Sequence, residues 1–197
     1  MDLGRIVAFT DGVMAVAITL LVLNIQVPDL PSGREGELAD ELVDLLPSLG
    51  AYALAFALVG RYWTIHHRLF ENLEAFDGVL MTLNLVFLAL IALVPFSAEL
   101  IDKYREEPIA AAVFGATLGF AALVHLAMVR HVLNREFVRD HKRLPSEPFG
   151  GAVALTLTVV FFLSVPVAFV STLLAEALWL SAIVLRYPLH RVGRRPR

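Results

Sequence analysis

The sequence contains no cysteine, which excludes disulfide bonds, thiolate catalysis and metal sites built from cysteine. It also lacks the motifs of several enzyme classes: there is no phosphate-binding glycine loop, no Walker lysine, no HExxH pair and no serine on a plausible nucleophile elbow. No TVGYG-like filter is present, and no long basic arm makes nucleic acid an expected partner. We therefore expect a protein that is not an enzyme and needs no cofactor.

Charge is scarce, and apolar residues dominate instead. Hydrophobic residues make up 58% of the 197 residues and the mean hydropathy is +0.72, whereas soluble domains are usually about 45–50% apolar. A bilayer core needs about 20 mostly apolar residues in a helix, and six segments meet this need: roughly residues 6–27, 45–67, 76–98, 109–132, 149–171 and 173–190. We expect an all-α membrane protein in which residues 1–197 form one domain of six transmembrane helices.

The loops between these segments differ in charge, which predicts the orientation in the membrane. Successive loops lie on alternate sides of the membrane, and 13 of the 16 basic residues fall on the side that holds both termini. Only Arg34, Lys103 and Arg105 fall on the other side. Because basic residues favour the cytoplasmic side, we expect both termini to be cytoplasmic. We therefore interpret the Arg-rich C-terminus as an anchor to inner-leaflet lipids. The first apolar segment is long enough to span, and we expect it to be retained rather than cleaved as a signal peptide. The outer loop 28–41 is acidic. Its negative charges either concentrate cations near the membrane or belong to an ordinary solvent-exposed loop.

The first apolar segment carries a narrow stripe. Its residues share one face of a helical wheel, with Thr19 at the edge: Arg5, Phe9, Gly12, Val16, Leu20, Leu23 and Val27. Such spacing is typical of a helix that meets a partner or lines a symmetry axis. Around an axis, Val16, Leu20 and Leu23 become stacked apolar rings, which can gate ions by dewetting. Plain helix packing is the alternative interpretation.

A polar cluster stands at one end of the same segment. Ionisable groups there cost free energy unless they are paired or wetted, so Arg5 and Asp11 indicate a functional cluster, with Asp11 expected to point away from the stripe into the bundle. The second segment ends in Trp63, His66 and His67, which are expected to complete a hydrogen-bonded network. Adjacent histidines on a helix point in different directions, so we expect no fixed metal site.

The polar cluster also resembles a known signature. Arg5, Phe9, Thr10, Asp11 and Gly12, followed by VMAVAITLLVL, resemble the R-x-x-x-F-S-D motif of the transmembrane protein 175 family of lysosomal and prokaryotic potassium channels. Thr10 stands where the family usually has serine, which keeps the hydroxyl. The stretch WTIHHRLF resembles the family's W-x-x-H-H motif, and LNLVFLALIALVPF resembles its third helix.

The resemblance implies a homotetramer in a prokaryotic plasma membrane, with the first helices lining a pore for potassium ions. It places the narrowest apolar ring at Val16, three residues before the matching Thr19, and the next rings at Leu20 and Leu23. Thr19 is then related to selectivity. A structural network follows from the same resemblance: Arg5, Phe9, Thr10, Asp11 and Gly12, with Trp63 and either His66 or His67 as partners. We therefore expect a potassium-permeable leak channel.

Three other functions stay open at this point. A proton-coupled transporter or proton leak would use Asp11, His66 and His67. A membrane redox protein would ligate haem through His66 and His125. A structural membrane subunit would use the polar cluster only to lock its helices together.

Overall fold

The computed structural model describes residues 3–32, 35–137 and 151–184, and its elements are all helices. The first half of the chain contains α1 (Leu3–Leu20) with its short 3₁₀ extension η1 (Leu21–Asn24), η2 (Glu35–Glu37), α2 (Leu38–Asp44) and α3 (Leu46–Glu71). The second half contains α4 (Gly78–Ala92), α5 (Val94–Lys103), α6 (Pro108–Asn134), α7 (Gly151–Ala168) and α8 (Thr172–Val184). The all-helical expectation is confirmed.

Four stretches of the described chain are long and apolar enough to cross a membrane: Leu3–Asn24, Gly78–Lys103, Pro108–Asn134 and Gly151–Ala168. A fifth arises if α2 and α3, which meet at a bend of 42°, count as one span. The expected sixth span corresponds to α8, whose apolar stretch Thr172–Ile183 is shorter, and residues 185–190 lie outside the described part. Six full spans therefore stay a prediction.

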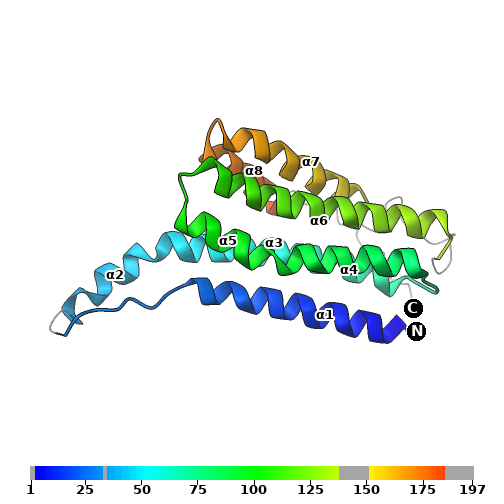
Figure 1. Ribbon diagram of the computed structural model, residues 1–197, viewed down its shortest axis with the longest axis horizontal. Helices are drawn as coiled ribbons and strands as arrows, with labels where there is room; N and C mark the ends of the chain where they lie inside the picture. Colours follow the sequence, from blue (N-terminus) through cyan, green and yellow to red (C-terminus); the bar gives the residue numbers. More distant parts are fainter. Residues whose placement is uncertain (1–2, 33–34, 138–150, 185–197) are drawn as a thin grey trace, which may run out of the picture.

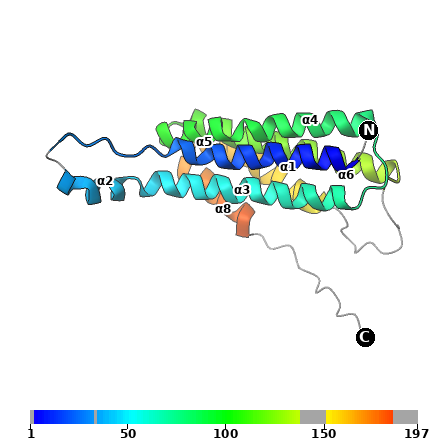
Figure 2. The ribbon, with the colours of Figure 1, turned by 90° about the horizontal axis from the view of Figure 1, so that it is seen from below.

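The long helices run side by side, and α1 lies at one flank of the bundle (Figures 1 and 2). It packs against α3 and α4, while α6 lies between α4 on one side and α7 and α8 on the other. Helix α6 has the largest set of buried residues among the described helices. Because α1 has neighbours on one side only, its other side is open in the isolated chain.

The break between α4 and α5 lies where the sequence places Pro95. Proline cannot donate to the carbonyl four residues earlier, so a helix bends or breaks there. Helix α4 ends at Ala92 and α5 begins at Val94, so Pro95 lies in the first turn of α5. The Asn24 side-chain amide donates to the Pro95 carbonyl oxygen at 3.0 Å, which ties the end of α1 to this break. Pro166, by contrast, lies inside α7.

Helices α6 and α7 approach each other closely at two glycines of α6. A β-carbon at Gly115 would lie 2.5 Å from the Ser164 hydroxyl oxygen, whereas one at Gly119 would lie 3.4 Å from the Phe162 ring. Ser164 in turn accepts a hydrogen bond of 2.8 Å from the indole N–H of Trp179 on α8. Small residues four apart allow such close packing of helices in a membrane.

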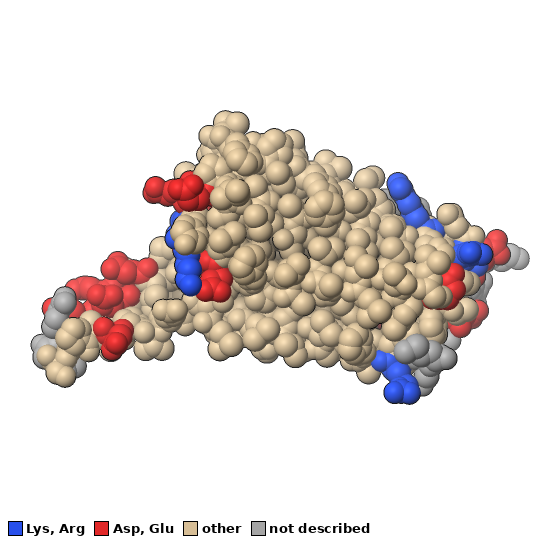
Figure 3. Space-filling model, in the orientation of Figure 1, with Lys and Arg blue, Asp and Glu red and all other residues tan. Residues whose placement is uncertain are grey.

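On the face seen in Figure 3, charged residues gather at the two ends of the bundle and leave an uncharged belt between them. Arg5, Arg68 and Arg135 lie at one end, since α1 begins there and α3 and α6 end there. The opposite end holds the turn from α5 to α6 and the acidic α2, which projects beyond the bundle (Figure 1). The belt has the composition that a bilayer core requires. Eight further basic residues on which the predicted orientation depends lie outside the described residues: Arg139, Lys142, Arg143, Arg186, Arg191, Arg194, Arg195 and Arg197.

Candidate pore-lining face

Helix α1 presents one face to the bundle and the opposite face outward. Ile6, Thr10, Met14 and Ala17 are buried. The predicted stripe lies on the other side: the exposed fraction is 57% for Val16, 42% for Leu20 and 70% for Leu23. Such large apolar side chains exposed in a row indicate a surface that meets lipid, a partner or a conduit. The structure thus separates the buried and outward faces of the first helix as the wheel predicts.

An open, apolar groove follows this outward face. Its volume is about 410 Å³, and its floor includes Phe9, Gly12, Val16 and Leu20 from α1 and Ala92 from α4. A β-carbon added at Gly12 would meet no atom within 4 Å. Gly12 therefore leaves space on the outward face rather than allowing close packing within this chain.

The helix tightens where the stripe ends. Residues Leu21–Asn24 form a 3₁₀ turn, in which side chains three apart eclipse one another. Leu23 lies within this turn, and Leu20 is the residue directly before it. The Thr19 hydroxyl donates to the Val16 carbonyl oxygen at 2.9 Å, which holds the hydroxyl beside the predicted narrowest ring and leaves its lone pairs outward.

A buried chain of polar side chains joins three helices behind this face. The Asn84 amide nitrogen donates to the Thr10 hydroxyl oxygen at 3.0 Å, and the Asn84 amide oxygen lies 2.9 Å from Nε2 of His66. With the amide nitrogen committed to Thr10, the amide oxygen accepts and His66 carries its proton on Nε2. Thr10, His66 and Asn84 are all buried. This chain fixes α1 against α3 and α4.

A second, more exposed cluster runs along α3. The Trp63 indole N–H donates to the Asp11 carboxylate at 2.9 Å. The Trp63 ring stacks on His67 with centroids 5.1 Å apart, and Nε2 of His67 lies 3.0 Å from the Glu71 carboxylate. Asp11 is half-buried and faces Trp63. The residue of the motif that enters the bundle is thus Thr10, and the expectation that Asp11 points into the bundle is corrected.

The expected single network is therefore divided in two. His66 belongs to the buried chain with Thr10, while His67 belongs to the exposed cluster with Asp11 and Trp63. Arg5 is exposed, and no hydrogen bond or ion pair joins its side chain to another described residue. Its contribution to a network stays a prediction.

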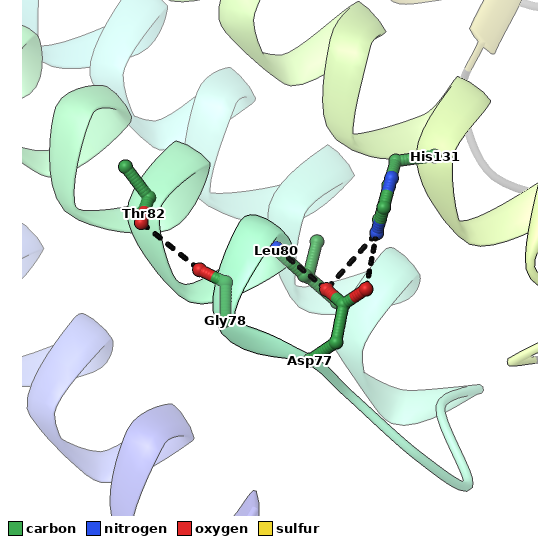
Figure 4. Close-up of polar contacts among 5 residues, drawn as sticks. All are labelled: Asp77, Gly78, Leu80, Thr82 and His131. Atoms are coloured by element: carbon green, nitrogen blue, oxygen red, sulfur yellow. Dashed lines mark hydrogen bonds and ion pairs between the residues drawn. The ribbon is translucent and has the colours of Figure 1, made fainter.

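Asn84 is the partner that sequence reasoning did not assign, although its amide in an apolar segment was a signal for a bond across helices. A further pair was missed altogether. Asp77 accepts from the backbone N–H of Leu80 at 2.9 Å and so caps α4, and both its carboxylate oxygens lie 2.9 Å from Nε2 of His131 on α6 (Figure 4). The Leu80 N–H, and then His131, hold the pKa of Asp77 below its ordinary value.

His125 lies close to the buried chain, with its ring centroid 6.0 Å from that of His66. Neither of its ring nitrogens has a hydrogen-bond partner among the described residues, although it is fully buried. No group of three or more His, Cys, Asp or Glu side chains in the described ranges is placed to hold a metal ion.

Taken together, the apolar belt and the two-sided first helix define a helical membrane protein whose first helix presents an apolar face away from the bundle. The chain belongs to the TMEM175 family, a family of ion channels rather than enzymes. The family model described as the endosomal/lysosomal potassium channel TMEM175 matches residues 5–95, which include the stripe and both polar clusters. The resemblance noted from the motif is confirmed.

Bacterial relatives are named potassium channels. The chain is 38% identical over 135 residues to one from Streptomyces collinus, covering 66% of this chain and 64% of that protein. It is 33% identical over 138 residues to one from a Chryseobacterium species, covering 69% of this chain and 68% of that protein. The chicken relative, named endosomal/lysosomal proton channel TMEM175, is 33% identical over 109 residues, which are 52% of this chain and 22% of that protein.

A solved structure shows the same fold. The crystal structure of a lysosomal potassium-selective channel TMEM175 homologue from Chamaesiphon minutus matches with a TM-score of 0.76 and 27% identity, covering 92% of this chain and 94% of that chain.

Proposed function

We propose that this protein is a potassium-permeable leak channel of a prokaryotic plasma membrane, with four copies of α1 around a central pore. Ions pass down their gradient, so conduction needs no cofactor. The bacterial relatives named potassium channels support the ion. The observation that carries the pore is the outward exposure of Val16, Leu20 and Leu23 on α1, which lies at one flank of the bundle.

The constriction follows from the order of these side chains along α1. Around an axis, Val16 forms one apolar ring, and Leu20 and Leu23 form two more toward the predicted outer end. Apolar rings oppose ion passage by dewetting, so the diameter at Val16 and partial dehydration beside the Thr19 hydroxyl set conductance and selectivity. Valine is smaller than the isoleucine common in the family, which favours a wider ring.

The polar clusters act as supports rather than as the conduit. The buried Thr10–Asn84–His66 chain and the Asp11–Trp63 bond hold one side of α1, which leaves the stripe on the other side. Buried hydrogen bonds of this kind favour one packing arrangement, because an alternative that breaks them leaves buried polar groups unpaired. Both termini are cytoplasmic in this proposal, and the charge-free belt contacts membrane lipids.

A second candidate is proton permeation. The vertebrate relatives are named proton channels, and the Thr10–Asn84–His66 chain is a line of hydrogen bonds within the span. A proton that moves along these hydrogen bonds would reach His66. Asp11 and His67 belong to the separate, more exposed cluster.

Flux from proteoliposomes that contain potassium, sodium or caesium as the only cation tests the proposal. We expect passive efflux that is fastest for potassium or caesium, does not saturate like a carrier and needs no pH gradient. Flux that tracks only the pH gradient would support the proton candidate instead. Purified protein that carries no current with any cation contradicts both.

A further inference from the structure

A second cavity lies at the end of the bundle opposite to Arg5, where α3, α5, α6 and α8 meet. Its volume is about 290 Å³, and its walls are apolar: Ala51 and Leu54 from α3, Ala98 from α5, Phe114 from α6 and Trp179 from α8. None of its lining residues belongs to the groove along α1 or to the polar clusters. The cavity therefore needs an explanation of its own.

Two side chains of opposite charge stand in the lining of this apolar cavity. Arg105 comes from the turn between α5 and α6, and Glu176 comes from α8. The Arg105 guanidinium only reaches Asp102 at 4.0 Å, the outer limit of an ion pair. In the described part of the chain, no hydrogen bond or ion pair engages the Glu176 carboxylate. Both groups are therefore free to bind a ligand that carries both charges.

The surroundings limit what such a ligand is. Apolar cavities do not hold water well, because a buried water needs several polar partners. The cavity is near the lower limit of about 300 Å³ for small-molecule sites, so it holds part of one chain-like molecule. Its lining runs from apolar helix residues to Arg105 in the turn from α5 to α6, at one end of the bundle, the level at which lipid headgroups meet acyl chains.

We propose that this cavity binds a phospholipid with a zwitterionic ethanolamine headgroup from the leaflet at the α2 end. Part of an acyl chain fills the apolar space between Leu54, Phe114 and Trp179. The phosphate accepts hydrogen bonds from Arg105, whose planar guanidinium suits phosphate oxygens. The ammonium group meets Glu176. This site does not depend on ion conduction and is tested separately from it.

Trp179 makes the test direct, because its indole ring lines the cavity and is buried in the protein. The protein is reconstituted in phosphatidylcholine vesicles with a minor fraction of phosphatidylethanolamine that carries a brominated acyl chain. Bromine in the cavity quenches Trp179 fluorescence, and we expect saturable quenching. Trp63 lies at the other end of the molecule and adds the same background in every variant.

Filling the cavity removes its space for the chain. A β-carbon at Gly50 meets no atom within 4 Å, so Gly50→Leu is accommodated and projects into the cavity, and Ala51→Phe fills it further. We expect both to abolish the saturable quenching, whereas Ala53→Phe, on the exposed side of the same helix, keeps it. Quenching that is unchanged in Gly50→Leu and Ala51→Phe overturns the proposal.

The headgroup is tested by single charge changes. We expect Arg105→Gln and Glu176→Gln each to weaken the apparent affinity about tenfold, the loss of one charge-assisted hydrogen bond. Lys103→Gln is the control: like Arg105→Gln it removes a positive charge near the cavity, but Lys103 does not line the cavity, so we expect the affinity to be kept. With brominated phosphatidylglycerol, which has no ammonium, Glu176→Gln has no effect. Equal affinity in both charge variants and the parent protein overturns headgroup recognition.

Discussion

At the scale of single residues, the position of α1 depends on a few polar side chains in an apolar setting. A hydrogen bond across membrane helices contributes only about 1 kcal/mol, but it also decides which face of the helix turns outward. Thr10 turns in to reach Asn84, and Asp11 turns aside to reach Trp63. Since Val16 lies on the outward side of the same helix, these bonds determine where the valine points.

The first prediction concerns the ring at Val16. Val16→Asn places a polar group of similar size in the proposed constriction and makes it easier to hydrate, so we expect a higher single-channel conductance and a lower preference for potassium over sodium. Currents in planar bilayers measure both quantities. Val22→Asn is the matched control, because Val22 is also exposed on the first helix but lies off the stripe. If the two variants conduct alike, Val16 is not the constriction.

A second prediction concerns Asp77, which caps α4 and faces His131 (Figure 4). Its pKa is lower in the folded protein than the ordinary value of 3.8, so folding favours the charged carboxylate. This stabilisation is complete above the ordinary pKa and is lost as the pH falls through the lower, folded value. Asp77→Asn keeps an oxygen to accept from Leu80 but cannot make this charge-dependent contribution.

Thermal unfolding in detergent between neutral pH and about pH 3 measures this contribution. We expect Asp77→Asn to be less stable than the parent protein at neutral pH and the difference to shrink on acidification. Asp40→Asn, on the exposed α2, controls for the general effect of removing a carboxylate. A constant difference between Asp77→Asn and the parent across the pH range would show that the charge of Asp77 is not involved.

At the scale of helices, close packing is uneven along the bundle. Helix α6 packs most closely against α7, where Gly115 leaves no room for a side chain. Ser164, the neighbour of Gly115, is also the acceptor for Trp179 on α8. One small residue therefore holds three helices in register, whereas α1, which packs through side chains only on its inner face, is joined less tightly to the rest.

Replacing the two glycines of α6 tests this difference. The β-carbon of Gly115→Ala meets the Ser164 oxygen at 2.5 Å and displaces the acceptor of Trp179, so we expect a loss of about 1–3 kcal/mol, the usual cost of overpacking. Gly119→Ala meets only the Phe162 ring at 3.4 Å, and alanine gains up to about 1 kcal/mol in helix propensity. Thermal melts and the Trp179 emission wavelength report both effects. A Gly115→Ala protein as stable as Gly119→Ala would contradict the packing argument.

These elements also show how far sequence reasoning reached. Hydropathy locates α1, α4 with α5, α6 and α7, because a long apolar run in a bilayer has few alternatives to a helix. The break at Pro95 follows from the missing N–H of proline. The predicted segment 173–190 locates α8 as far as the described residues extend. The bend between α2 and α3 does not follow, since length and composition say little about where a helix bends.

The polar clusters were predicted less completely. Periodicity places Val16 and Leu20 on one face. It does not decide whether Thr10 or its neighbour Asp11 faces the bundle, because a small rotation of the helix exchanges the two. His66 and His67 raise the same ambiguity, and tertiary contacts resolve it: Asn84 selects His66, and Trp63 selects His67. The Asp77–His131 pair joins residues 54 apart in the sequence, and no local pattern indicates it.

At the scale of the whole molecule, the isolated chain leaves an apolar helix face, an open groove and a motif arginine on the same flank. Two environments satisfy such a face in a membrane, namely lipid and further copies of the chain. The two sets of hydrogen bonds fix α1 against α3 and α4 in either case. In the proposed assembly they have a further consequence, because helices around an axis form a pore only if each presents the same residues inward.

The absence of cysteine from the chain makes this assembly directly measurable. Leu20→Cys introduces one thiol on the outward face of α1, and copies around a narrow axis bring such thiols within reach of a disulfide, which requires Cα atoms about 4.4–6.8 Å apart. We expect oxidation in the membrane to give covalent dimers within a complex whose mass in native mass spectrometry is that of four chains. Leu174→Cys on α8 is as exposed in the single chain but lies on the other side of the bundle, so it stays monomeric on a denaturing gel. Cross-linking of Leu174→Cys without Leu20→Cys would place α8 rather than α1 at the axis, and a complex of one chain would leave the stripe facing lipid.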